Sequence, residues 1–467
     1  MKKTISCRAA TVALAALCLF FIVFEISVSS TSRFLKYAAT TTTTYSAKTQ
    51  EEGNHEKTKL IDQPNSHPSE YLQLPVKRRI ICDRTDVRYD LCSINGPTVL
   101  DPPTSTFFTM GSAQPPQVEK VQPYPRKFEG FIMPHIRNLT LTSGPQSPPC
   151  KVRHSVPALV FSAGGYTGNF FHDFNDGFIP LFITVNTIFP DQEIEIVIVV
   201  SEAPNWWPSK YADLLAMFTK YPIIILKNAT TTHCFPSATI GLISHGFMTI
   251  NQTLLPKPKS FMDFRVLLEK AYGPKAQPKV LTSKPTRSRP RLVLADREMA
   301  HGRMIMNQKQ LIRLIKKVGF ELIVFNPKRM TPLHESYALL NSSHAMIGVH
   351  GAALTHSFFL RPGSVFVQVV PIGIEWGAYA FFGRMARSLD LEYSEYKIGV
   401  NESSLADKYG KENLLIKDPF ALQKTGWPPE VMNIYLKEQN VKLDLERFKS
   451  CLKKAYTKAT RFMEKNG

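Results

Sequence analysis

The chain has 467 residues, with 57 Lys and Arg against 38 Asp and Glu, which gives a formal net charge of +19. At ~150 residues per domain, this length predicts two or three domains. A hydrophobic fraction of 43% and a charged fraction of 20% exclude a chain that is disordered throughout. The positive charge is compatible with nucleic acid, an anionic polymer, an anionic small ligand or a membrane surface, and composition does not choose among them.

The N-terminus has the pattern of a signal-anchor followed by a stem. Basic residues in positions 1–8 precede an apolar run within residues 9–30, close in length to the ~20 residues of a spanning helix. Because the basic residues come first, we expect residues 1–8 in the cytosol and the remainder in the lumen; cleavage after Ser27–Ser30 is the alternative. Residues 31–79 contain a threonine run and little apolar periodicity, which predicts a disordered stem. A secretory chain does not meet nuclear nucleic acid, so no nucleic-acid partner is expected.

Sequons and cysteines fit this placement. N-glycosylation is predicted at four Asn-x-Ser/Thr sequons: Asn138, Asn228, Asn251 and Asn401. Five of the seven cysteines lie beyond the anchor, and in an oxidising lumen they predict two disulfides and one free thiol. We expect the pairs Cys82–Cys92 and Cys150–Cys234, with Cys451 free; other pairings of the five are open at this point.

Strands and helices alternate in two successive segments of the chain. In residues 80–273, strands are predicted at 158–162, 193–200 and 223–226, and helices at 170–189 and 210–221. Residues 274–290 are rich in proline and basic residues and predict a linker. In residues 291–467, strands are predicted at 291–295, 321–325, 345–349 and 364–370, and helices at 307–319 with Asn307 as the cap, at 334–340, from 351, and from 429 to the end. This pattern predicts an α/β fold of two Rossmann-like domains facing a cleft, the GT-B-like arrangement.

A turn after the predicted strand 345–349 is a candidate anion site. His350 ends the strand, and Gly351, Ala352 and Ala353 open the predicted helix. In a doubly wound sheet, ligands bind at the carboxyl ends of the strands, and the first N–H groups of a helix attract phosphate. These four residues are therefore candidates for binding a pyrophosphate. A tight turn packed for structure alone is the alternative.

Two arginines follow the first strand of the second segment. Arg297 comes directly after the strand predicted at 291–295, and Arg303 follows closely. The arginine guanidinium makes bidentate, permanently charged contacts to phosphate oxygens, so both are candidates for donor binding. Solvated charge beside the basic linker is the alternative, which applies more to Arg303.

A glycine-rich segment, residues 164–177, contains the candidate catalytic groups. At helical spacing His172 and Asp176 lie on one face, whereas Asp173 points elsewhere. A histidine can take a proton from a hydroxyl near neutral pH, and a carboxylate can orient it. We predict His172, Asp173 and Asp176 as catalytic, with Asp173 or His172 as the base. Alternatively, the histidine is structural and the carboxylates form caps or ion pairs.

No Asp-x-Asp motif occurs in the chain. This carboxylate pair commonly carries the divalent ion of a sugar-nucleotide site. We therefore predict no metal site, no cofactor and a metal-independent mechanism in which arginines and helix dipoles stabilise the departing diphosphate.

Several motifs together resemble the plant glycosyltransferases of family 61, in particular the grass-expanded group of xylan arabinosyl- and xylosyltransferases. The resemblance spans about residues 80 to 450, and its motifs are Cys82–Cys92, Pro123–Lys127, Phe161–Asn169, His172–Gly177, Ile179–Ile183, His233–Pro236, Gly348–Thr355, Phe359–Gly363, Gln368–Pro371 and Gln439–Val441. It implies a single-pass type II Golgi membrane protein with a luminal GT-B-like catalytic region and inverting transfer from a nucleotide sugar.

The resemblance also implies substrates and partners. The donor would be a UDP-pentose, arabinofuranose or xylose, held by residues 291–467; the acceptor would be xylan, lying across residues 80–273. The Golgi membrane and members of a xylan-synthesis complex are the other expected partners. Asp296 departs from the family's usual Ile-Ser-Arg at 295–297, and a carboxylate there weakens donor binding unless it points away. The alternative function is therefore a non-catalytic scaffold or polysaccharide-binding member of such a complex.

Overall fold

The computed structural model describes residues 79–109, 116–144, 146–190, 195–276, 289–297, 301–424 and 428–466. The predicted cytosolic tail, the signal-anchor, the stem up to residue 78 and most of the predicted linker lie outside these residues. No helix within the described ranges is long and apolar enough to cross a membrane. The larger of two compact units comprises residues 76–416 and 433–467 and contains every site discussed below.

Two six-stranded sheets form the first half of this unit. The first has the order β1-β2-β12-β8-β9-β10 and comprises β1 (Ile80–Asp83), β2 (Leu91–Ile94), β12 (Ala238–Ile240), β8 (Ala158–Phe161), β9 (Val197–Val200) and β10 (Ile224–Ile225). Strands β12, β8, β9 and β10 run parallel, and β1 and β2 add an antiparallel edge. The second has the order β5-β6-β4-β3-β11-β7 and comprises β5 (Val118–Val121), β6 (Leu139–Thr142), β4 (Thr106–Thr109), β3 (Thr98–Asp101), β11 (His233–Phe235) and β7 (Val152–Arg153).

The second sheet corrects the prediction of a Rossmann-like first domain. Alternate residues of β8 face opposite sides: Ala158 and Val160 pack in a core between the two sheets, whereas Leu159 and Phe161 pack against helices. One face of the first sheet is therefore covered by strands and only the other by helices. The strands of the second sheet are at most four residues long, too short for their alternation to stand out in the sequence.

The helix predicted at 170–189 forms as one continuous run with a π-helical turn inside it. It comprises α2 (Phe170–His172), the π-helical η2 (Asp173–Phe178) and α3 (Ile179–Ile188). The prediction of one helix at 210–221 is wrong. Two short helices, α4 (Trp207–Lys210) and α5 (Ala212–Leu215), form in this region instead. Tyr211 separates them with φ −104° and ψ 12°, outside the helical range, and its hydroxyl is held by Asp173. The longer α6 (Phe261–Tyr272) follows, with a capping box at Ser260.

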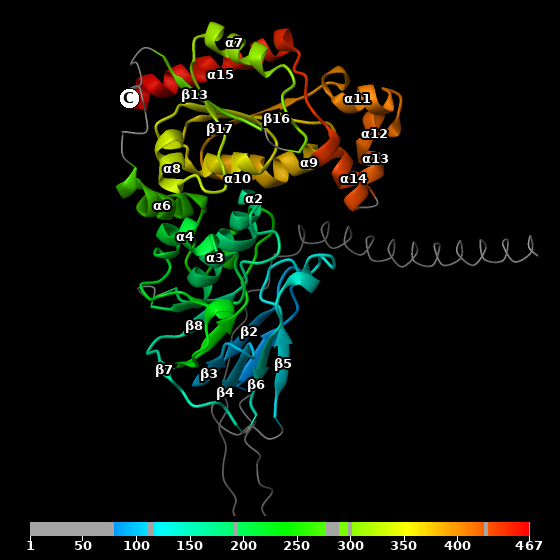
Figure 1. Cartoon of the computed structure of the whole chain (residues 1–467). Helices are drawn as coiled ribbons and strands as arrows, with labels where there is room; N and C mark the ends of the chain where they lie inside the picture. The colour runs from blue at the N-terminus through cyan, green and yellow to red at the C-terminus, as the bar shows by residue number, and fades with distance from the viewer. Residues whose placement is uncertain are drawn as a thin grey trace, which may run out of the picture. The chain divides into compact units, whose positions relative to one another are not determined.

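The second half is built on a five-stranded, fully parallel sheet. Its order, β14-β13-β15-β16-β17, is that of doubly wound α/β folds, and its strands are β14 (Glu321–Phe325), β13 (Arg291–Ala295), β15 (Ala345–Val349), β16 (Val365–Val370) and β17 (Glu392–Lys397). Helices α7 (Gln308–Val318) and α15 (Leu445–Asn466) cover one face; α8 (Leu333–Asn341), η7 (Ala352–Phe359) and α10 (Arg384–Ser388) cover the other (Figure 1). The first four strands, the helices α7 and α8 and the terminal helices confirm the predictions; β17 was not predicted.

The larger unit also contains shorter elements. They are η1 (Met133–His135), η3 (Leu226–Asn228), η4 (Gln252–Leu254), η5 (Gly273–Lys275), α9 (Glu375–Ala378), the π-helical η8 (Tyr379–Gly383), η9 (Val400–Glu402), α11 (Ser404–Tyr409) and the π-helical η10 (Ile434–Glu438). The helices α12 (Leu414–Lys417) and α14 (Pro429–Asn433) each have residues in both units. The smaller unit includes residues 417–432 and within them α13 (Pro419–Gln423).

Two local predictions in the second half need correction. The segment after Gly351 is a 3₁₀ helix rather than an α-helix; its turn closes with Leu354 N–H donating to the Gly351 carbonyl at 2.9 Å. Asn307 precedes α7 as expected, but its side chain does not cap the helix. Instead it exchanges two hydrogen bonds with the backbone of Leu443, which ties α7 to the C-terminal segment.

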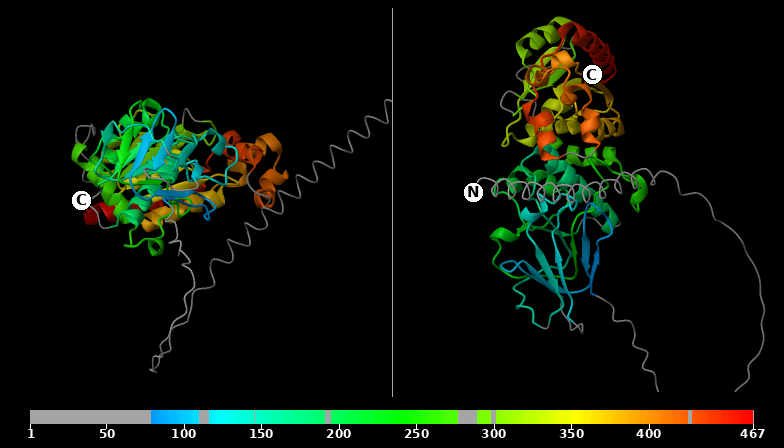
Figure 2. Two further views of the ribbon diagram at one scale, coloured as in Figure 1. Left: turned by 90° about the horizontal axis from the view of Figure 1, so that it is seen from below. Right: turned by 90° about the vertical axis from the view of Figure 1, so that its right-hand side faces the viewer.

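The two halves share one apolar core. Phe174 of η2 and Phe264 of α6 both pack on Phe358 of η7, with ring centroids 5.6 and 5.5 Å apart. The helices α2, α3 and α6 therefore lie between the first sheet and the helical layer of the parallel sheet (Figures 1 and 2). This shared core brings the glycine-rich segment and the η7 turn into one neighbourhood.

Candidate active site

His172 and Asp176 form a hydrogen-bonded pair at the start of η2. His172 Nδ1 lies 2.7 Å from an Asp176 carboxylate oxygen and 3.2 Å from Arg126 Nη2, and the shorter contact, to the carboxylate that can only accept, assigns the proton to Nδ1. Because Nδ1 donates, the free ring nitrogen, Nε2, is an acceptor in the neutral imidazole. Nε2 makes no hydrogen bond to any residue that the structure describes, and the side chain is 18% exposed. The pair thus has the arrangement of an oriented general base.

Asp176 is held ionised by its surroundings. Its carboxylate is buried and also accepts hydrogen bonds from Arg126 Nε at 2.9 Å, the Tyr124 hydroxyl at 3.0 Å and the Asn175 amide. Burial alone would raise the pKa of Asp176, but the charges of Arg126 and His172 and the hydrogen bonds lower it to about 2. Asp176 therefore accepts from His172 over the whole physiological pH range and fixes its tautomer.

Asp173 lies on the other side of the turn and is not placed to act as a base. Its two carboxylate oxygens accept hydrogen bonds from the Tyr211 hydroxyl at 2.6 Å and from the Gly168 N–H at 3.1 Å. The carboxyl is only 4% exposed, and burial raises its pKa. The geometry thus favours His172 over Asp173 as the base, with Asp173 fixing the glycine-rich loop to α5.

Two guanidinium groups converge on the turn after β15. A Cβ atom added to Gly351 would lie 2.1 Å from Nη1 of Arg297 and 3.5 Å from Nη1 of Arg303, so both side chains lie against the Cα of this glycine. Arg303 Nη1 donates to the His350 carbonyl at 2.8 Å. Burial lowers the pKa of both arginines, and the charge of Arg297 lowers that of Arg303 further. Neither forms an ion pair with a carboxylate that the structure describes, so among the described residues the two guanidinium groups form a positive site without a counter-ion.

The C-terminal segment 436–441 positions Arg303. The Arg303 backbone N–H donates to the Gln439 carbonyl, and its Nε donates to the Leu436 carbonyl at 2.9 Å. Gly302 adopts φ +73°, and a Cβ there would lie 2.3 Å from the Lys437 carbonyl oxygen, so only glycine allows this approach. From the sequence we predict no role for the Gln439–Val441 motif. In the structure its Gln439 holds the loop that carries Arg303.

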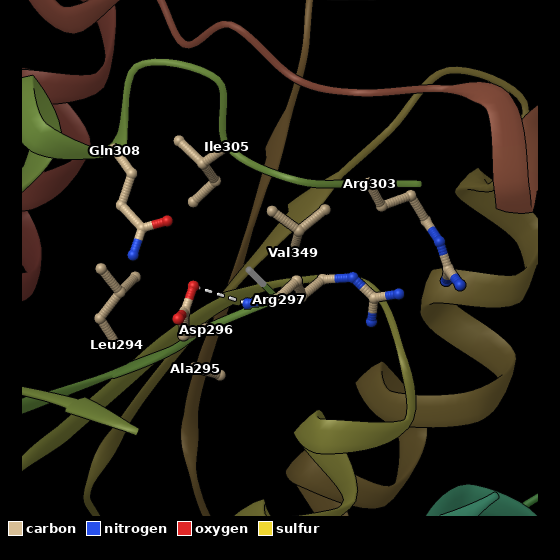
Figure 3. A pocket seen from close by; sticks show the side chains of 8 residues that line it. All are labelled: Leu294, Ala295, Asp296, Arg297, Arg303, Ile305, Gln308 and Val349. Atoms are coloured by element: carbon tan, nitrogen blue, oxygen red, sulfur yellow. Dashed lines mark hydrogen bonds between the residues drawn. The ribbon is translucent and has the colours of Figure 1, made fainter. Parts of the chain in front are cut away.

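Asp296 does not oppose this positive site. Its carboxylate accepts a hydrogen bond from the Arg297 backbone N–H at 2.7 Å, and Figure 3 shows it turned away from the guanidinium and toward Gln308. A shallow hollow lies here, lined by Leu294, Ala295, Asp296, Arg297, Arg303, Ile305, Gln308 and Val349.

His350 is a neutral hydrogen-bond donor beside the arginines. Burial, with the charges of Arg303 and Arg297, lowers its pKa well below the usual histidine value. Its Nδ1 accepts a hydrogen bond from the buried Gln368 amide at 2.7 Å, and the Tyr393 hydroxyl donates to the Gln368 carbonyl oxygen at 2.7 Å. The proton of neutral His350 therefore lies on Nε2.

Aromatic side chains connect the His172–Asp176 pair with the arginine site, which is the pair Arg297 and Arg303 at Gly351. Phe171 of α2 lies 5.1 Å from Phe381 and 5.7 Å from Phe382, measured between ring centroids. The His350 ring lies 6.0 Å from Phe381 and 5.4 Å from Phe382. The aromatic rings of Phe171, Phe381 and Phe382 thus link the helix of His172 to His350.

The structure brings together all the predicted site residues in these two groups. Ala352 and Ala353 begin η7, and their N–H groups make no hydrogen bond to the described part of the chain. Sequence reasoning missed the supporting residues Arg126, Tyr124 and Gln368. Each lies in a motif that carries the family resemblance, and this resemblance was the only indication of a role. The position of each residue in the sequence does not predict which side chain it contacts.

The remaining predicted sites are also placed. Disulfides join Cys82 to Cys92 and Cys150 to Cys234, the two expected pairs, and Cys451 is free. The four asparagines predicted to be glycosylated are exposed: Asn138, Asn228, Asn251 and Asn401. Within the described ranges, no group of three or more His, Cys, Asp or Glu is arranged to hold a metal ion.

Comparison with known proteins identifies the family. The model of the family described as Glycosyltransferase 61 matches residues 168–367. Over 402 residues the chain is 39% identical to Xylan glycosyltransferase MUCI21 of Arabidopsis thaliana, which covers 82% of this chain and 80% of that protein. The chain belongs to glycosyltransferase family 61. The family predicted from the motifs is confirmed, and the protein is a glycosyltransferase.

Other relatives of this family 61 glycosyltransferase come from Oryza sativa subsp. japonica. It is 33% identical to Beta-1,2-xylosyltransferase XYXT1 over 395 residues, 80% of this chain and 83% of that one. It is 33% identical to Alpha-1,3-arabinosyltransferase XAT3 over 378 residues, 80% of this chain and 64% of that one. Among solved structures, the bacterial glycosyltransferase TibC from enterotoxigenic E. coli covers 83% of this chain and 94% of its own at 10% identity. Its TM-score of 0.27 is too low to indicate a shared fold.

Proposed function

We propose that this glycosyltransferase transfers a pentose, arabinofuranose or xylose, from a UDP-sugar to a hydroxyl of the xylan backbone with inversion at the anomeric carbon. The name of the Arabidopsis relative supports xylan as acceptor, and the names of the two rice relatives, an arabinosyltransferase and a xylosyltransferase, support a pentose as the transferred sugar. We further propose that its two halves work in the GT-B-like manner, in the Golgi lumen, on a type II membrane anchor formed by residues 9–30. Other members of a xylan-synthesis complex are the proposed protein partners.

The observation that carries the proposal is the pair of guanidinium groups at Gly351. Arg297 and Arg303 lie at the carboxyl ends of parallel strands, where ligands of doubly wound sheets bind. Burying two like charges without a counter-ion is unfavourable, and a diphosphate would supply that counter-ion. The N–H groups of Ala352 and Ala353 and the Nε2–H of His350 add neutral donors to the same site.

The proposed reaction is a single displacement. His172 Nε2 takes the proton of the acceptor hydroxyl, whose oxygen forms a bond to the anomeric carbon of the pentose. The bond between that carbon and the diphosphate oxygen breaks on the opposite side, and its electron pair leaves with UDP. Arg297, Arg303 and His350 stabilise the charge that develops on the leaving diphosphate, so we propose a metal-independent reaction without a cofactor.

The experiment is a donor panel. The purified luminal chain is incubated with each of several UDP-sugars and xylohexaose, with and without a metal chelator. The masses of the oligosaccharide products are then determined by mass spectrometry. We expect addition of a single pentose type, unchanged by the chelator. Transfer of a hexose instead, or no transfer from any UDP-pentose, would contradict the proposed donor; loss of transfer on chelation would contradict only the metal-independent mechanism.

The orientation of Asp296 removes the reason for proposing a non-catalytic scaffold. That alternative rested on Asp296 as a sign of a decayed donor site, and the carboxylate of Asp296 is turned away from the guanidinium of Arg297. UDP binding without turnover for every donor in the panel would restore it.

A further inference from the structure

We propose that a strip of exposed and partly buried aromatic side chains beside His172 binds the sugar units of the acceptor that flank the reacting one. The strip is formed by Phe128, Phe131, Tyr166, Phe247, Trp376 and Phe381. This inference rests on the proposed function for the identity of its ligand, a neutral β-linked xylose chain. It concerns a binding surface that reaches the donor site only at Phe381, whose ring lies 6.0 Å from that of His350.

The strip begins at the proposed base. The Tyr166 ring stacks on His172 with ring centroids 4.3 Å apart and an angle of 23° between the planes. Phe131 lies 6.2 Å from Tyr166 and is 56% exposed. An acceptor hydroxyl that reaches His172 Nε2 therefore brings the adjoining sugar rings next to these two aromatic residues.

The strip continues across to the second half of the unit. Phe247 lies 6.5 Å from Phe128, 6.1 Å from Trp376 and 5.2 Å from Phe381. Phe128 and Trp376 are 43% and 54% exposed. Three exposed aromatic rings, linked through the partly buried rings of Tyr166, Phe247 and Phe381, form an apolar patch of the kind that commonly marks a binding site.

Arg126 connects the two ends of the strip without giving it a net positive charge. Its guanidinium lies 4.9 Å from the Phe247 ring centroid and 5.7 Å from that of Tyr166. Arg126 forms ion pairs with both Asp176 and Glu129, so these three side chains together have a formal charge of −1. The surface is therefore aromatic with no unpaired cation at Arg126, unlike the arginine site, and does not favour an anionic ligand.

A neutral sugar chain suits this surface chemically. The faces of a pyranose ring present C–H groups with partial positive charge, which are attracted to the negative faces of aromatic rings. Xylose has no hydroxymethyl group, so both faces of a xylan chain can lie flat on such rings. The strip and the oriented histidine would together select the polymer and position one of its hydroxyls.

The test measures oligosaccharide binding separately from transfer. Phe131→Ala and Trp376→Ala remove exposed rings at the two ends, and Val118→Ala on β5, 61% exposed, is the matched control for removal of exposed apolar surface. Affinity for xylohexaose alone, without donor, is measured by calorimetry; affinity for UDP and the urea midpoint report on folding and on the donor site. Trp376→Phe tests whether an aromatic ring suffices.

We expect each alanine variant to bind xylohexaose about three- to tenfold more weakly, with UDP affinity and stability unchanged. The loss should be smaller for xylobiose, because it spans fewer rings, and Trp376→Phe should restore most of the affinity. Wild-type xylohexaose affinity in both alanine variants, or no xylohexaose binding by the wild type, would overturn the proposal. If the variants lose binding but the wild type transfers no pentose, the strip is supported and the proposed donor fails.

Discussion

Replacing Asp176 with asparagine separates the proposed catalytic role of the His172–Asp176 pair from its structural role. The substitution keeps the size of the side chain but removes its charge. An asparagine can present its amide N–H instead of its oxygen to His172 Nδ1, so the imidazole loses its fixed tautomer. Arg126 also loses one of its two carboxylate partners, although the ion pair with Glu129 at 2.6 Å remains.

The size of the structural effect follows from the pKa of Asp176. The surroundings lower that pKa from an ordinary 3.8 to about 2, and at ~1.4 kcal/mol per pKa unit this corresponds to on the order of 2 kcal/mol of stability. Because the folded-state pKa lies below the unfolded value, this contribution is complete above about pH 5 and is lost as the pH falls toward 2. The difference in unfolding free energy between the wild type and Asp176→Asn should therefore shrink on acidification.

The catalytic effect should be much larger than the structural one. We expect kcat to fall about 10²–10⁴-fold, while the affinity for UDP is unchanged because Asp176 does not contact the arginine site. UDP release from UDP-pentose and xylohexaose gives kcat, and urea unfolding at several pH values gives stability. Asp173→Asn is the matched control, since it changes an equally buried carboxyl of the same helical turn that faces Tyr211; it should lower stability but keep kcat within a few-fold. A large loss of kcat in Asp173→Asn together with near wild-type kcat in Asp176→Asn would refute this assignment.

Three further predictions concern the donor site and the disulfides. Arg297→Gln and Arg303→Gln should each weaken UDP binding about 10–100-fold, measured by calorimetry, because each removes a charge-assisted contact; unchanged affinity in both would exclude this site. Gly351→Ala should weaken UDP binding about tenfold at an unchanged urea midpoint, because the added Cβ displaces the Arg297 guanidinium; a folded variant with wild-type affinity would argue against that approach. Removing the Cys150–Cys234 disulfide, which closes 84 residues, should lower the unfolding free energy by about 4.5 kcal/mol, against about 3 kcal/mol for the β1–β2 disulfide; equal losses in urea titrations would contradict the chain-entropy reasoning.

Four of the five strands of the parallel sheet in the second half could be predicted almost residue by residue, and β17 could not. The strands β13, β14 and β15 are wholly or largely apolar runs bounded by turn residues, so their limits agree with the predicted ranges. The second sheet of the first half could not be predicted, because its strands are short and pair across long separations. For example, β11 lies between β3 and β7, which are distant in sequence. The alternation of apolar and polar residues within a strand does not indicate which distant strand it pairs with.

The candidate site was predictable where a local pattern carries the chemistry. His172 and Asp176 are four residues apart, and helical spacing alone brings them together. The partners of these residues come from elsewhere: Arg126 reaches Asp176 across 50 residues, and Arg303 is held by a segment that begins 133 residues later. The 3₁₀ form of η7 was also missed, since it depends on the buried packing around Leu354 and Phe358 rather than on helix propensity.

The most direct test of the account is single-turnover transfer by His172→Ala with bound UDP-pentose and saturating xylohexaose. The account separates the base from the donor site, so it predicts wild-type affinity for UDP-pentose and a rate of pentose transfer reduced about 10²–10⁴-fold. Transfer at the wild-type rate, or a loss of activity that follows only from a loss of UDP-pentose binding, would contradict it.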